Sequence, residues 1–291
     1  ITLEPCYHYG RTPPCVDAVI SSGVRRVIIG TKDPNPLTRG KSIRKLNRMG
    51  VKTRVGVLGK ETAALNIDFE KWVTKQLPYT ISKTAQTLDG KIAASSGDSK
   101  WVTSLKARQA ARKKRNDFDA IMVGINTVLK DDPHLTANGS RKRLKRIVVD
   151  SRLRVPLNAN IFRSGKCEDC VIATTKRASE VKIRKLRAKG VQVLICPSIQ
   201  NQVQLKALWK ELAKMKVVRL LLEGGANLIG GALKEKLIDE MHFYIAPKIA
   251  GDQKALSSVQ GIHLMGVERA IKLKHLTVEY LNPEVVIKAH V

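Results

Sequence analysis

Short apolar runs alternate with amphipathic stretches along most of the chain, which is the pattern of a layered α/β protein. Runs rich in Val and Ile predict strands at 25–31, 51–58, 120–124, 146–151, 170–175, 191–196 and 217–223. Stretches with helical spacing lie between such runs, at 40–50, 61–76, 104–117 and 203–215. The last of these predicts a helix with one buried face, because its apolar residues recur at the helical period: Leu205, Leu208, Leu212 and Met215.

A change in the pattern predicts a domain boundary. Pro78 and a fresh strand in "LPYTISKTAQTLDG" follow directly on the second predicted helix. We therefore expect domains at 1–76 and 77–291. The first of these has two clear strands, which is too little for a comfortable independent core.

The end of the chain changes character again. Three strands follow one another there with little helix between them, at 240–249, 274–281 and 284–291. This arrangement predicts an antiparallel edge on an otherwise parallel, and therefore mixed, sheet.

Composition narrows the classes of function. The chain has 53 Lys and Arg against 25 Asp and Glu, a formal charge of +28, which suits a nucleic-acid-binding protein. The basic residues are spread over the whole length, and 4% of residues are aromatic, so stacking platforms for single strands are scarce. The apolar runs are too short to span a bilayer. Five cysteines without a regular framework favour a reducing, cytoplasmic compartment.

The opening stretch "TLEPCYHYGRTPPC" has the composition of a metal site. Cys6 and Cys15 each follow a proline, and zinc deaminases hold their metal with one His and two Cys. A cysteine at a helix start has a lowered pKa, which favours metal binding. His8 is a candidate third ligand, and two buried reduced thiols are the alternative. Because the chain begins with Ile1 inside what looks like a strand end, we expect a missing N-terminal segment.

The second domain carries a candidate phosphate site and an unusual lysine. In "LLLEGGANLIGG", an acidic residue ends a strand and glycines open a helix, where backbone amides can approach a phosphate; mere packing is the alternative. Lys83 lies within a strand, either as an edge lysine or near a substrate. The pair Cys167 and Cys170 lacks a second pair, and we interpret it as two incidental thiols.

These blocks resemble one family. The chain is similar to the bifunctional riboflavin-biosynthesis deaminase/reductases in the stretches "TLEPCYHYGRTPPCVDAVI", "DPNP", "KTAQTLDGKIAASSGDSKWVTS", "GINTVLKDDPHLT", "IVVDSRLRVP" and "LLLEGGANLIGGAL". The resemblance covers essentially the whole chain. It implies a truncated cytidine-deaminase-like domain followed by a dihydrofolate-reductase-like α/β domain with a mixed sheet. The implied reaction is NADPH-dependent reduction of 5-amino-6-(5-phosphoribosylamino)uracil to its ribitylamino form.

The resemblance also implies roles for residues of the second domain. Lys83 and Glu223 would be catalytic. Substrate contacts would come from Ser99, Arg115, which would grip the phosphate, Leu135 and Glu223. NADPH contacts would come from Ala85, Trp101, Thr127, Asp131, Ser151, Gly225, Ala226, Asn227, Leu228, Ile229, Gly230 and Gly231. Trp101 has the alternative of a core aromatic, and Arg115 that of a solvated helix end.

In the first domain the resemblance implies that zinc is held by Cys6 and Cys15 and that substrate contacts come from His8, Arg11, Asp33 and Asn35. The family's His-Ala-Glu motif supplies the third ligand and the proton-shuttling Glu, and no His-x-Glu occurs in these 291 residues. We therefore do not expect deamination by this chain.

One phosphate contact also departs from the family, because Asn138 stands where many members have arginine; Arg141 or Arg143 could replace it. The expected partners are a small pyrimidine phosphoribosyl substrate and further copies of the chain, without nucleic acid or membrane. A nucleic-acid-binding or nucleobase-deaminating protein and a non-catalytic oligomerising scaffold stay open as alternatives.

Overall fold

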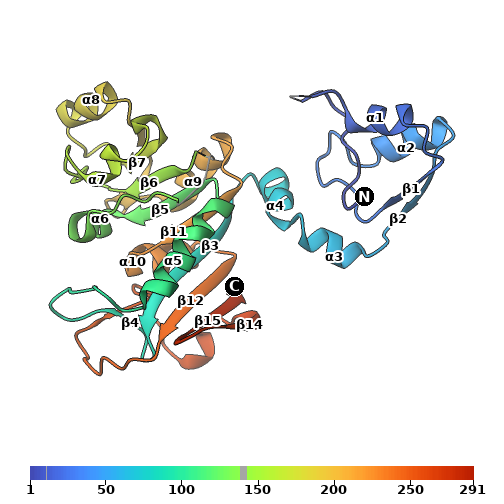
Figure 1. Ribbon diagram of the computed structural model, residues 1–291. Coiled ribbons are helices and arrows are strands. Elements are labelled where there is room, and N and C mark those ends of the chain that lie inside the picture. Colours follow the sequence, from blue (N-terminus) through green and yellow to red (C-terminus); the bar gives the residue numbers. More distant parts are fainter. Residues whose placement is uncertain (11, 138–142) are drawn as a thin grey trace. The chain divides into compact units, whose positions relative to one another are not determined.

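The computed structural model describes residues 1–10, 12–137 and 143–291. The chain divides into two compact units, Ile1–Leu77 and Pro78–Val291 (Figure 1), and each is described by itself. Within the described residues, no helix has the length and apolar character needed to cross a membrane.

The first unit is a small α/β assembly. Its elements are α1 (Cys15–Ser21), β1 (Arg26–Ile29), α2 (Lys41–Arg48), β2 (Lys52–Val55), α3 (Gly59–Ala64) and α4 (Ile67–Lys75). The strands β1 and β2 pair in parallel, and an isolated bridge joins Leu3 to Thr31 in the same direction. The core cluster is small and consists of Val16, Val27, Ile29, Leu46 and Val51.

The single helix predicted at 61–76 is wrong, because α3 and α4 are separate helices. Asn66 stands between them with φ −120°, outside the helical region. Its side-chain amide donates a hydrogen bond of 2.8 Å to the carbonyl of Thr62. Asn competes in this way for backbone groups that would otherwise continue a helix, and the apolar spacing does not reveal that competition.

The second unit is built on a nine-stranded sheet in the order β14-β15-β12-β3-β11-β5-β6-β7-β8. The bounds of these strands are β3 (Tyr79–Thr87), β5 (Ala120–Gly124), β6 (Lys145–Val149), β7 (Cys170–Thr174), β8 (Gln192–Ile195), β11 (Arg219–Glu223), β12 (Glu240–Ala246), β14 (Lys274–Leu281) and β15 (Glu284–His290). Short strands form two further pairs, β4 (Lys91–Ala93) with β13 (Leu256–Ser257), and β9 (Ser198–Ile199) with β10 (Gln202–Val203).

The sheet is mixed, as predicted. From β12 to β8 all neighbouring strands run parallel, and β15 runs antiparallel to both β12 and β14. The antiparallel edge is confirmed but begins at β15 rather than at β12, because β12 pairs in parallel with β3. The order of the strands also reverses along the chain. It runs outward from β5 to β8 and then returns to β11 beside β3, which creates a switch point at the carboxyl ends of these strands.

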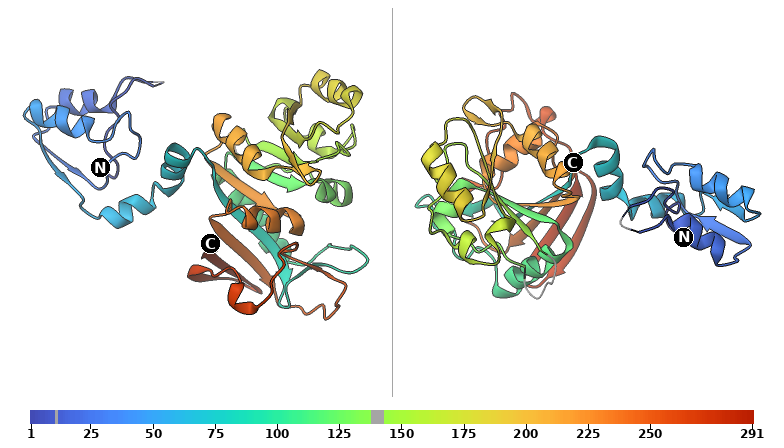
Figure 2. Two further views of the ribbon diagram at one scale, coloured as in Figure 1. Left: turned by 180° about the vertical axis from the view of Figure 1, so that it is seen from behind. Right: turned by 90° about the horizontal axis from the view of Figure 1, so that it is seen from above.

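Helices cover both faces of this sheet (Figures 1 and 2). They are α5 (Leu105–Lys114), α6 (Ile125–Asp131), α7 (Asn160–Arg163), α8 (Glu180–Ala188), α9 (Leu205–Lys214) and α10 (Ala226–Lys234), with 3₁₀ turns η1 (Arg115–Asp117), η2 (Cys167–Asp169) and η3 (Val267–Arg269). On one face, α5 packs small alanines against Tyr244 and Val286. On the other face, α9 meets the side chain of Thr80, and α10 lies next to α9 (Figure 2).

A buried indole joins α9 to the centre of the sheet. Trp209 is fully buried, and its Nε1–H donates a hydrogen bond of 2.9 Å to the hydroxyl of the equally buried Thr80. Buried indoles require such a partner, because an unpaired N–H away from water is costly. This contact fixes the helix to β3, the strand that also carries Lys83.

The substitution Trp209→Phe removes this donor and leaves unfilled volume beside Thr80. We expect the free energy of unfolding to fall by about 2–3 kcal/mol, measured by urea denaturation of the full chain. The matched control is Trp101→Phe, which removes an indole that is 57% exposed and should cost less than about 0.5 kcal/mol. Equal losses in the two variants would contradict the role given to the buried contact.

Candidate active site

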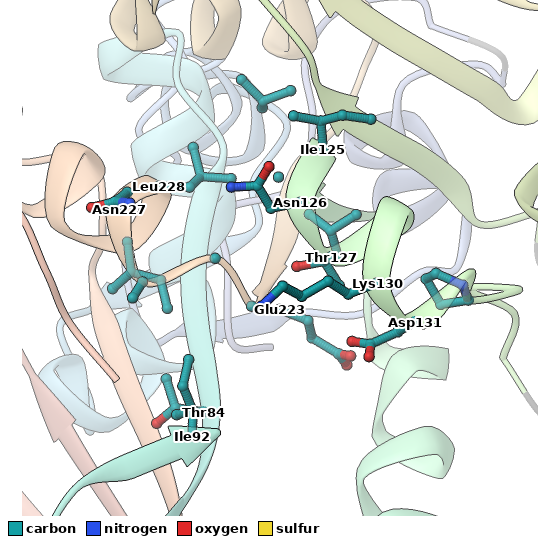
Figure 3. Close-up of a pocket in the computed structure, with 18 of the residues that line it drawn as sticks. Thr84, Ile92, Ile125, Asn126, Thr127, Lys130, Asp131, Glu223, Asn227 and Leu228 are labelled. Atoms are coloured by element: carbon teal, nitrogen blue, oxygen red, sulfur yellow. The ribbon is translucent and has the colours of Figure 1, made fainter. Parts of the chain in front are cut away.

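A large pocket of about 1550 Å³ opens at the carboxyl ends of β3, β5, β6 and β11. This is the switch point of the sheet, where open α/β sheets bind ligands. With one exception, the residues predicted for the site of this unit line the pocket: Lys83, Ala85, Ser99, Trp101, Arg115, Thr127, Asp131, Leu135, Ser151, Glu223, Gly225, Ala226, Asn227, Leu228, Ile229 and Gly231. In Figure 3, side chains of α6 and α10 point into the pocket from different directions, and Glu223 lies between α6 and Thr84.

The glycine turn after β11 brings backbone close to the pocket. Gly224 and Gly225 have φ +80° and +85°, which side chains of L residues disfavour. A Cβ on Gly224 would lie 3.3 Å from the hydroxyl of Thr127, and one on Gly225 would lie 3.7 Å from the backbone nitrogen of Gly124. The starts of α10 and α6 therefore meet here, with room for backbone amides to approach a ligand.

Gly230 is the exception among the predicted residues. A Cβ there would lie 1.8 Å from the backbone oxygen of Gln260, so glycine is required for packing against the 258–261 segment. Its place inside the family's glycine-rich block concealed this packing reason.

Three charged side chains meet at the base of the pocket. The register of β11 and β3 sets Glu223 beside Lys83. Arg115, in the turn η1 after α5, donates Nε–H to Oε1 of Glu223 at 3.1 Å and Nη2–H to Oε2 at 2.8 Å. The side chains of this pair are 15% and 14% exposed, respectively.

Burial and pairing compete in setting the protonation of this group. Burial alone would raise the pKa of Glu223, but the charge and hydrogen bonds of Arg115 outweigh it and hold the pKa below its ordinary value. For Lys83, burial lowers the pKa, and Glu223 only partly offsets this effect. Lys83 is therefore a cation that releases its proton more easily than an exposed lysine does.

The guanidinium of Arg115 is hydrogen-bonded to other groups of the protein. Besides its two bonds to Glu223, its Nη1–H donates to the carbonyl of Thr136 at 2.8 Å. The alternative of a solvated helix end is wrong, because the side chain is largely buried. The expected grip on a substrate phosphate stays a prediction, and in this structure the guanidinium contacts a carboxylate and a carbonyl.

A loop between β4 and α5 forms another wall of the pocket. The hydroxyl of Ser99 donates to Oδ1 of Asp131 on α6 at 3.2 Å. Trp101 is half-exposed, so the alternative of a core aromatic is wrong. The guanidinium of Arg108 lies 3.9 Å from its ring centroid, and Lys248 donates to its carbonyl at 2.9 Å.

Two further predicted residues are held by other parts of the unit. The hydroxyl of Ser151 accepts the N–H of Val203 at 3.1 Å, which leaves its own proton available to a ligand. Leu135 lines the pocket but is also packed in the main core cluster, so part of its role is structural.

Sequence reasoning missed several residues of the pocket. Arg108, Arg112, Asn126 and Lys130 all line it. The first two share a helical stripe with Arg115, at intervals of four and three residues, and that spacing is visible in the sequence.

The remaining residues that the sequence analysis considered for this unit do not contribute to the pocket in the described part of the chain. Arg143 forms ion pairs with Glu168 and Asp169 rather than lining the pocket. Asn138 and Arg141 fall outside the described residues. Burial raises the pKa of the Cys170 thiol to about 11, which agrees with an unreactive thiol.

The first unit brings together two of its predicted zinc ligands. The N–H of Cys15 lies 3.1 Å from the sulfur of Cys6. A hydrogen bond from Cys6 and burial raise the pKa of Cys15, so the lowering expected from the helix start is not found. His8 is bonded instead to the hydroxyl of Thr38 at 3.2 Å. Across the described part of the chain, no cluster of three His, Cys, Asp or Glu could hold a metal.

The predicted substrate residues of this unit form a separate polar group. The carboxylate of Asp33 accepts the N–H of Asn35 at 2.8 Å, and burial raises its pKa. Arg11 lies outside the described residues. Sequence reasoning gave no role to Glu4, which is buried and accepts the N–H groups of Asp33 and of Gly40 at the start of α2.

Comparison with known proteins identifies relatives over almost the whole chain. The family model described as RibD C-terminal domain matches residues 78–287. A riboflavin biosynthesis protein RibD of Aquifex aeolicus is 42% identical over 289 residues, covering 99% of this chain and 78% of that protein.

Solved structures agree with these matches. Acinetobacter baumannii RibD is similar at 33% identity and a TM-score of 0.86, covering 99% of this chain and 79% of that chain. A Thermotoga maritima diaminohydroxyphosphoribosylaminopyrimidine deaminase/5-amino-6-(5-phosphoribosylamino)uracil reductase is similar at 30% identity and a TM-score of 0.81, covering 99% and 77%.

The mixed sheet, the glycine turn and the charged group in one pocket define an α/β protein with a ligand site at the switch point of its sheet, and the matches assign it to the reductases. The chain belongs to the RibD family of riboflavin-biosynthesis proteins, and its second unit is the family's C-terminal domain. It is an NADPH-dependent reductase. This membership favours an enzyme over the nucleic-acid-binding and scaffold alternatives.

The substitution Arg115→Met leaves Glu223 buried without its main partner. We expect a loss of about 3 kcal/mol in the free energy of unfolding at pH 7. In the folded chain the pKa of Glu223 lies below its unfolded-state value of about 4.3. Its ionised form therefore adds to the free energy of unfolding above about pH 4.3, and this contribution is lost as the pH falls through the folded-state pKa. The loss should therefore be smaller at pH 4 than at pH 7, as measured by urea denaturation.

The control for this prediction is Arg112→Met, on the helix α5 that precedes the turn of Arg115. Arg112 is exposed, so its substitution should lower the free energy of unfolding by less than about 0.5 kcal/mol. A destabilisation of Arg115→Met that does not change between pH 4 and pH 7 would rule out the charge pairing as its cause.

Proposed function

We propose that the second unit reduces 5-amino-6-(5-phosphoribosylamino)uracil to 5-amino-6-(5-phosphoribitylamino)uracil. The observation that carries the proposal is the group Lys83, Glu223 and Arg115 at the base of a pocket that also contains the glycine turn. In the reaction, the ribose opens to an imine, a hydride adds to C1′, and one proton adds to the neighbouring nitrogen. The same substrate stands in the name of the Thermotoga maritima relative.

The residues present fit a nicotinamide nucleotide. The pocket is large enough for a dinucleotide and a substrate together. Oδ1 of Asp150 is buried at the end of β6 without a hydrogen-bond partner among the described residues, and suits a ribose hydroxyl. When bound, NADPH supplies the hydride.

Residues of three elements would hold this cofactor. Ala226, Asn227, Leu228, Ile229 and Gly231 follow the turn at Gly225 in α10, Thr127 and Asp131 belong to α6, and Ser151 follows β6. Ala85 and the half-exposed ring of Trp101 would contact the nicotinamide end. Gly230 supports this arrangement by allowing the 258–261 segment to approach α10.

Lys83 is suited to donate the proton. Because burial lowers its pKa, its ammonium transfers a proton more readily near neutral pH than an exposed lysine. Glu223 holds this charge from the neighbouring strand and would bind the substrate, together with Ser99 and Leu135. Arg115 positions Glu223 and keeps it ionised, and it would also bind the substrate phosphate.

For the first unit we propose part of a cytidine-deaminase-like domain. Cys6 and Cys15 lie close enough to share a zinc ion, and no third ligand joins them among the described residues. Zinc would polarise a bound water, but the chain has no His-x-Glu to supply the proton-shuttling carboxylate. We therefore derive no hydrolytic step. Asp33, Asn35 and His8 would bind the substrate of this deaminase-like domain. We also propose that the protein is cytoplasmic.

The homo-oligomer also belongs to this proposal, and the outer strand β14 supports it. Leu276, Val278 and Tyr280 alternate along the strand and are 60%, 49% and 82% exposed. Within the described sheet, β14 has one neighbour, β15. A long apolar edge strand of this kind favours pairing with another chain.

The central test is NADPH oxidation by the full chain with the phosphoribosylamino-uracil, followed at 340 nm. We expect Lys83→Met to lower kcat by about 10²- to 10⁴-fold, because the general acid is lost. In the unsubstituted chain, kcat should fall as pH rises through the lowered pKa of Lys83, since its ammonium then loses the proton.

Stability separates this role from a structural one. The pKa of Lys83 lies below its unfolded-state value, so the charged form costs folding free energy at neutral pH. We therefore expect Lys83→Met to be at least as stable as the unsubstituted chain at pH 7. The control Lys106→Met, at an exposed position of α5, should change neither kcat nor the free energy of unfolding. Full activity in Lys83→Met would exclude its role as the acid.

A second test addresses assembly. Tyr280→Asp places a charge on β14, and we expect a smaller species than the unsubstituted chain in sedimentation velocity. Val181→Asp, at a 54% exposed position on α8, is the control and should sediment unchanged. A monomer in both the control and the unsubstituted chain would contradict the homo-oligomer.

A further inference from the structure

An aromatic ring lies beside Lys83 on the face of the sheet that α5 covers. In the register of β12 with β3, the partner of Lys83 is His242, and Tyr244 follows two residues later on β12. Successive side chains of a strand alternate between the two faces of a sheet, so Lys83 and Tyr244 are diagonal neighbours on one face. The ammonium nitrogen of Lys83 lies 5.1 Å from the centroid of the Tyr244 ring. The face of an aromatic ring attracts a cation at this distance.

The ring of Tyr244 is held in place by the core around it. It is 5% exposed and packs with Ala107 and Ala111 of α5 and with Val286 of β15. Ala85 packs against the same cluster and also lines the pocket. In the part of the chain that the structure describes, Tyr244 itself is not part of the pocket lining. Any effect of the ring on the reaction therefore passes through its neighbours.

Lys83 has few other polar partners. Burial and the charge of Arg115 lower its pKa, the charge of Glu223 raises it, and no hydrogen bond of the ammonium contributes within residues 1–10, 12–137 and 143–291. Both carboxylate oxygens of Glu223 already accept hydrogen bonds from Arg115. The ring of Tyr244 is therefore the contact that can set the direction of the ammonium group.

The tyrosine is a neutral partner of this cation. Burial, together with the charges of Glu279 and Glu223, raises the pKa of Tyr244 to about 12. The phenol therefore keeps its proton across the neutral range and is a poor acid or base for a reaction there. What Tyr244 offers to Lys83 is the electron-rich face of its ring.

The histidine in register with Lys83 does not compete with it as a second cation. Burial lowers the pKa of His242 more than the carboxylate of Glu240 raises it, and the charges of Lys114 and Lys288 lower it further. The Nε2 atom of His242 lies 3.0 Å from Oε2 of Glu240. At neutral pH the imidazole is therefore uncharged and bonded to a carboxylate, and the ring of the neighbouring tyrosine and the charge of Glu223 favour the Lys83 ammonium.

We infer that Tyr244 is a positioning residue for Lys83, an inference that rests on the proposed function of that lysine as the proton donor. The ring holds the ammonium at the base of the pocket and stabilises its charged form relative to the neutral amine. Because α5 and β15 fix the ring, the core beneath this helix also sets the place from which the proton is delivered. Packing under α5 alone is the alternative, and it would require a side chain of this size but not an electron-rich ring.

The test varies the electron density of the ring and keeps its size. Tyr244→Phe retains the ring face, Tyr244→Leu removes it, and Tyr244→trifluorophenylalanine keeps nearly the shape of phenylalanine with an electron-poor face. The measurement is the pH dependence of kcat for NADPH oxidation by the full chain with the phosphoribosylamino-uracil. Loss of the contact destabilises the Lys83 ammonium and lowers its pKa, so the fall of kcat with rising pH should begin at a lower pH.

We expect Tyr244→Leu and Tyr244→trifluorophenylalanine to move this fall to lower pH by about 0.5–1.5 units relative to Tyr244→Phe. Tyr244→Phe should stay within about 0.3 units of the unsubstituted chain, because it keeps the ring face. KM for NADPH should not change, since the ring lies outside the described pocket lining. The control is Phe243→trifluorophenylalanine, on the opposite face of β12, which should leave the pH profile in place.

Two results would overturn the inference. If the pH profiles of Tyr244→trifluorophenylalanine and Tyr244→Phe coincide, the ring only packs, and a loss of activity in Tyr244→Leu then reflects the cavity beneath α5. If Tyr244→Phe shifts the profile as far as Tyr244→Leu does, the hydroxyl group and not the ring face acts on Lys83.

Failure of the proposed function is recognised separately, because the pKa of Lys83 can be measured without turnover. In the full chain with isotope-labelled lysine side chains, the NMR signal that is absent from Lys83→Met reports its titration. If the unsubstituted chain does not oxidise NADPH with this substrate but the pKa of Lys83 is lower in Tyr244→trifluorophenylalanine than in Tyr244→Phe, the reaction is wrong and the contact stands. An equal pKa of Lys83 in these two variants would reject the contact itself, whatever the activity.

Discussion

The pairing of Arg115 with Glu223 beside Lys83 is the interaction on which the rest of the site depends. The parallel register of β3 and β11 forces an acid and a base into neighbouring positions at a partly buried sheet end. Two charges removed from water need excellent geometry and further hydrogen bonds to be tolerated. Arg115 supplies both, through two bonds to Glu223 and one to the carbonyl of Thr136.

This requirement explains why α5 is held at both ends. At its start, the hydroxyl of Ser104 accepts the N–H of Ala107 and donates to the buried carboxylate of Glu284 on β15 at 2.8 Å. At its end, Arg115 reaches Glu223 on β11. The helix therefore connects the antiparallel edge of the sheet with its parallel centre. A shift of α5 would disturb the charges at the base of the pocket.

Local sequence patterns predicted most of the strands and helices, but they did not predict which side chains of the site pair with one another. The strands at 120–124 and 170–175 match β5 and β7, because their buried apolar runs leave few alternatives. The partner of Arg115 could not be read from spacing, since Glu223 lies 108 residues away and only the sheet register brings it near. The break between the helices α3 and α4 at Asn66 could not be predicted from the sequence for a similar reason. It depends on one side-chain hydrogen bond and not on the apolar period.

The positions that break local rules are the ones that form the site. A lysine in a mostly buried strand, two successive glycines with positive φ and a half-exposed tryptophan each reduce stability where they stand. All of them line one pocket, whereas the buried thiol of Cys170, which breaks no such rule, lies in the core. Locally unfavourable residues that converge from separate elements are expected where function, rather than folding, has determined the sequence.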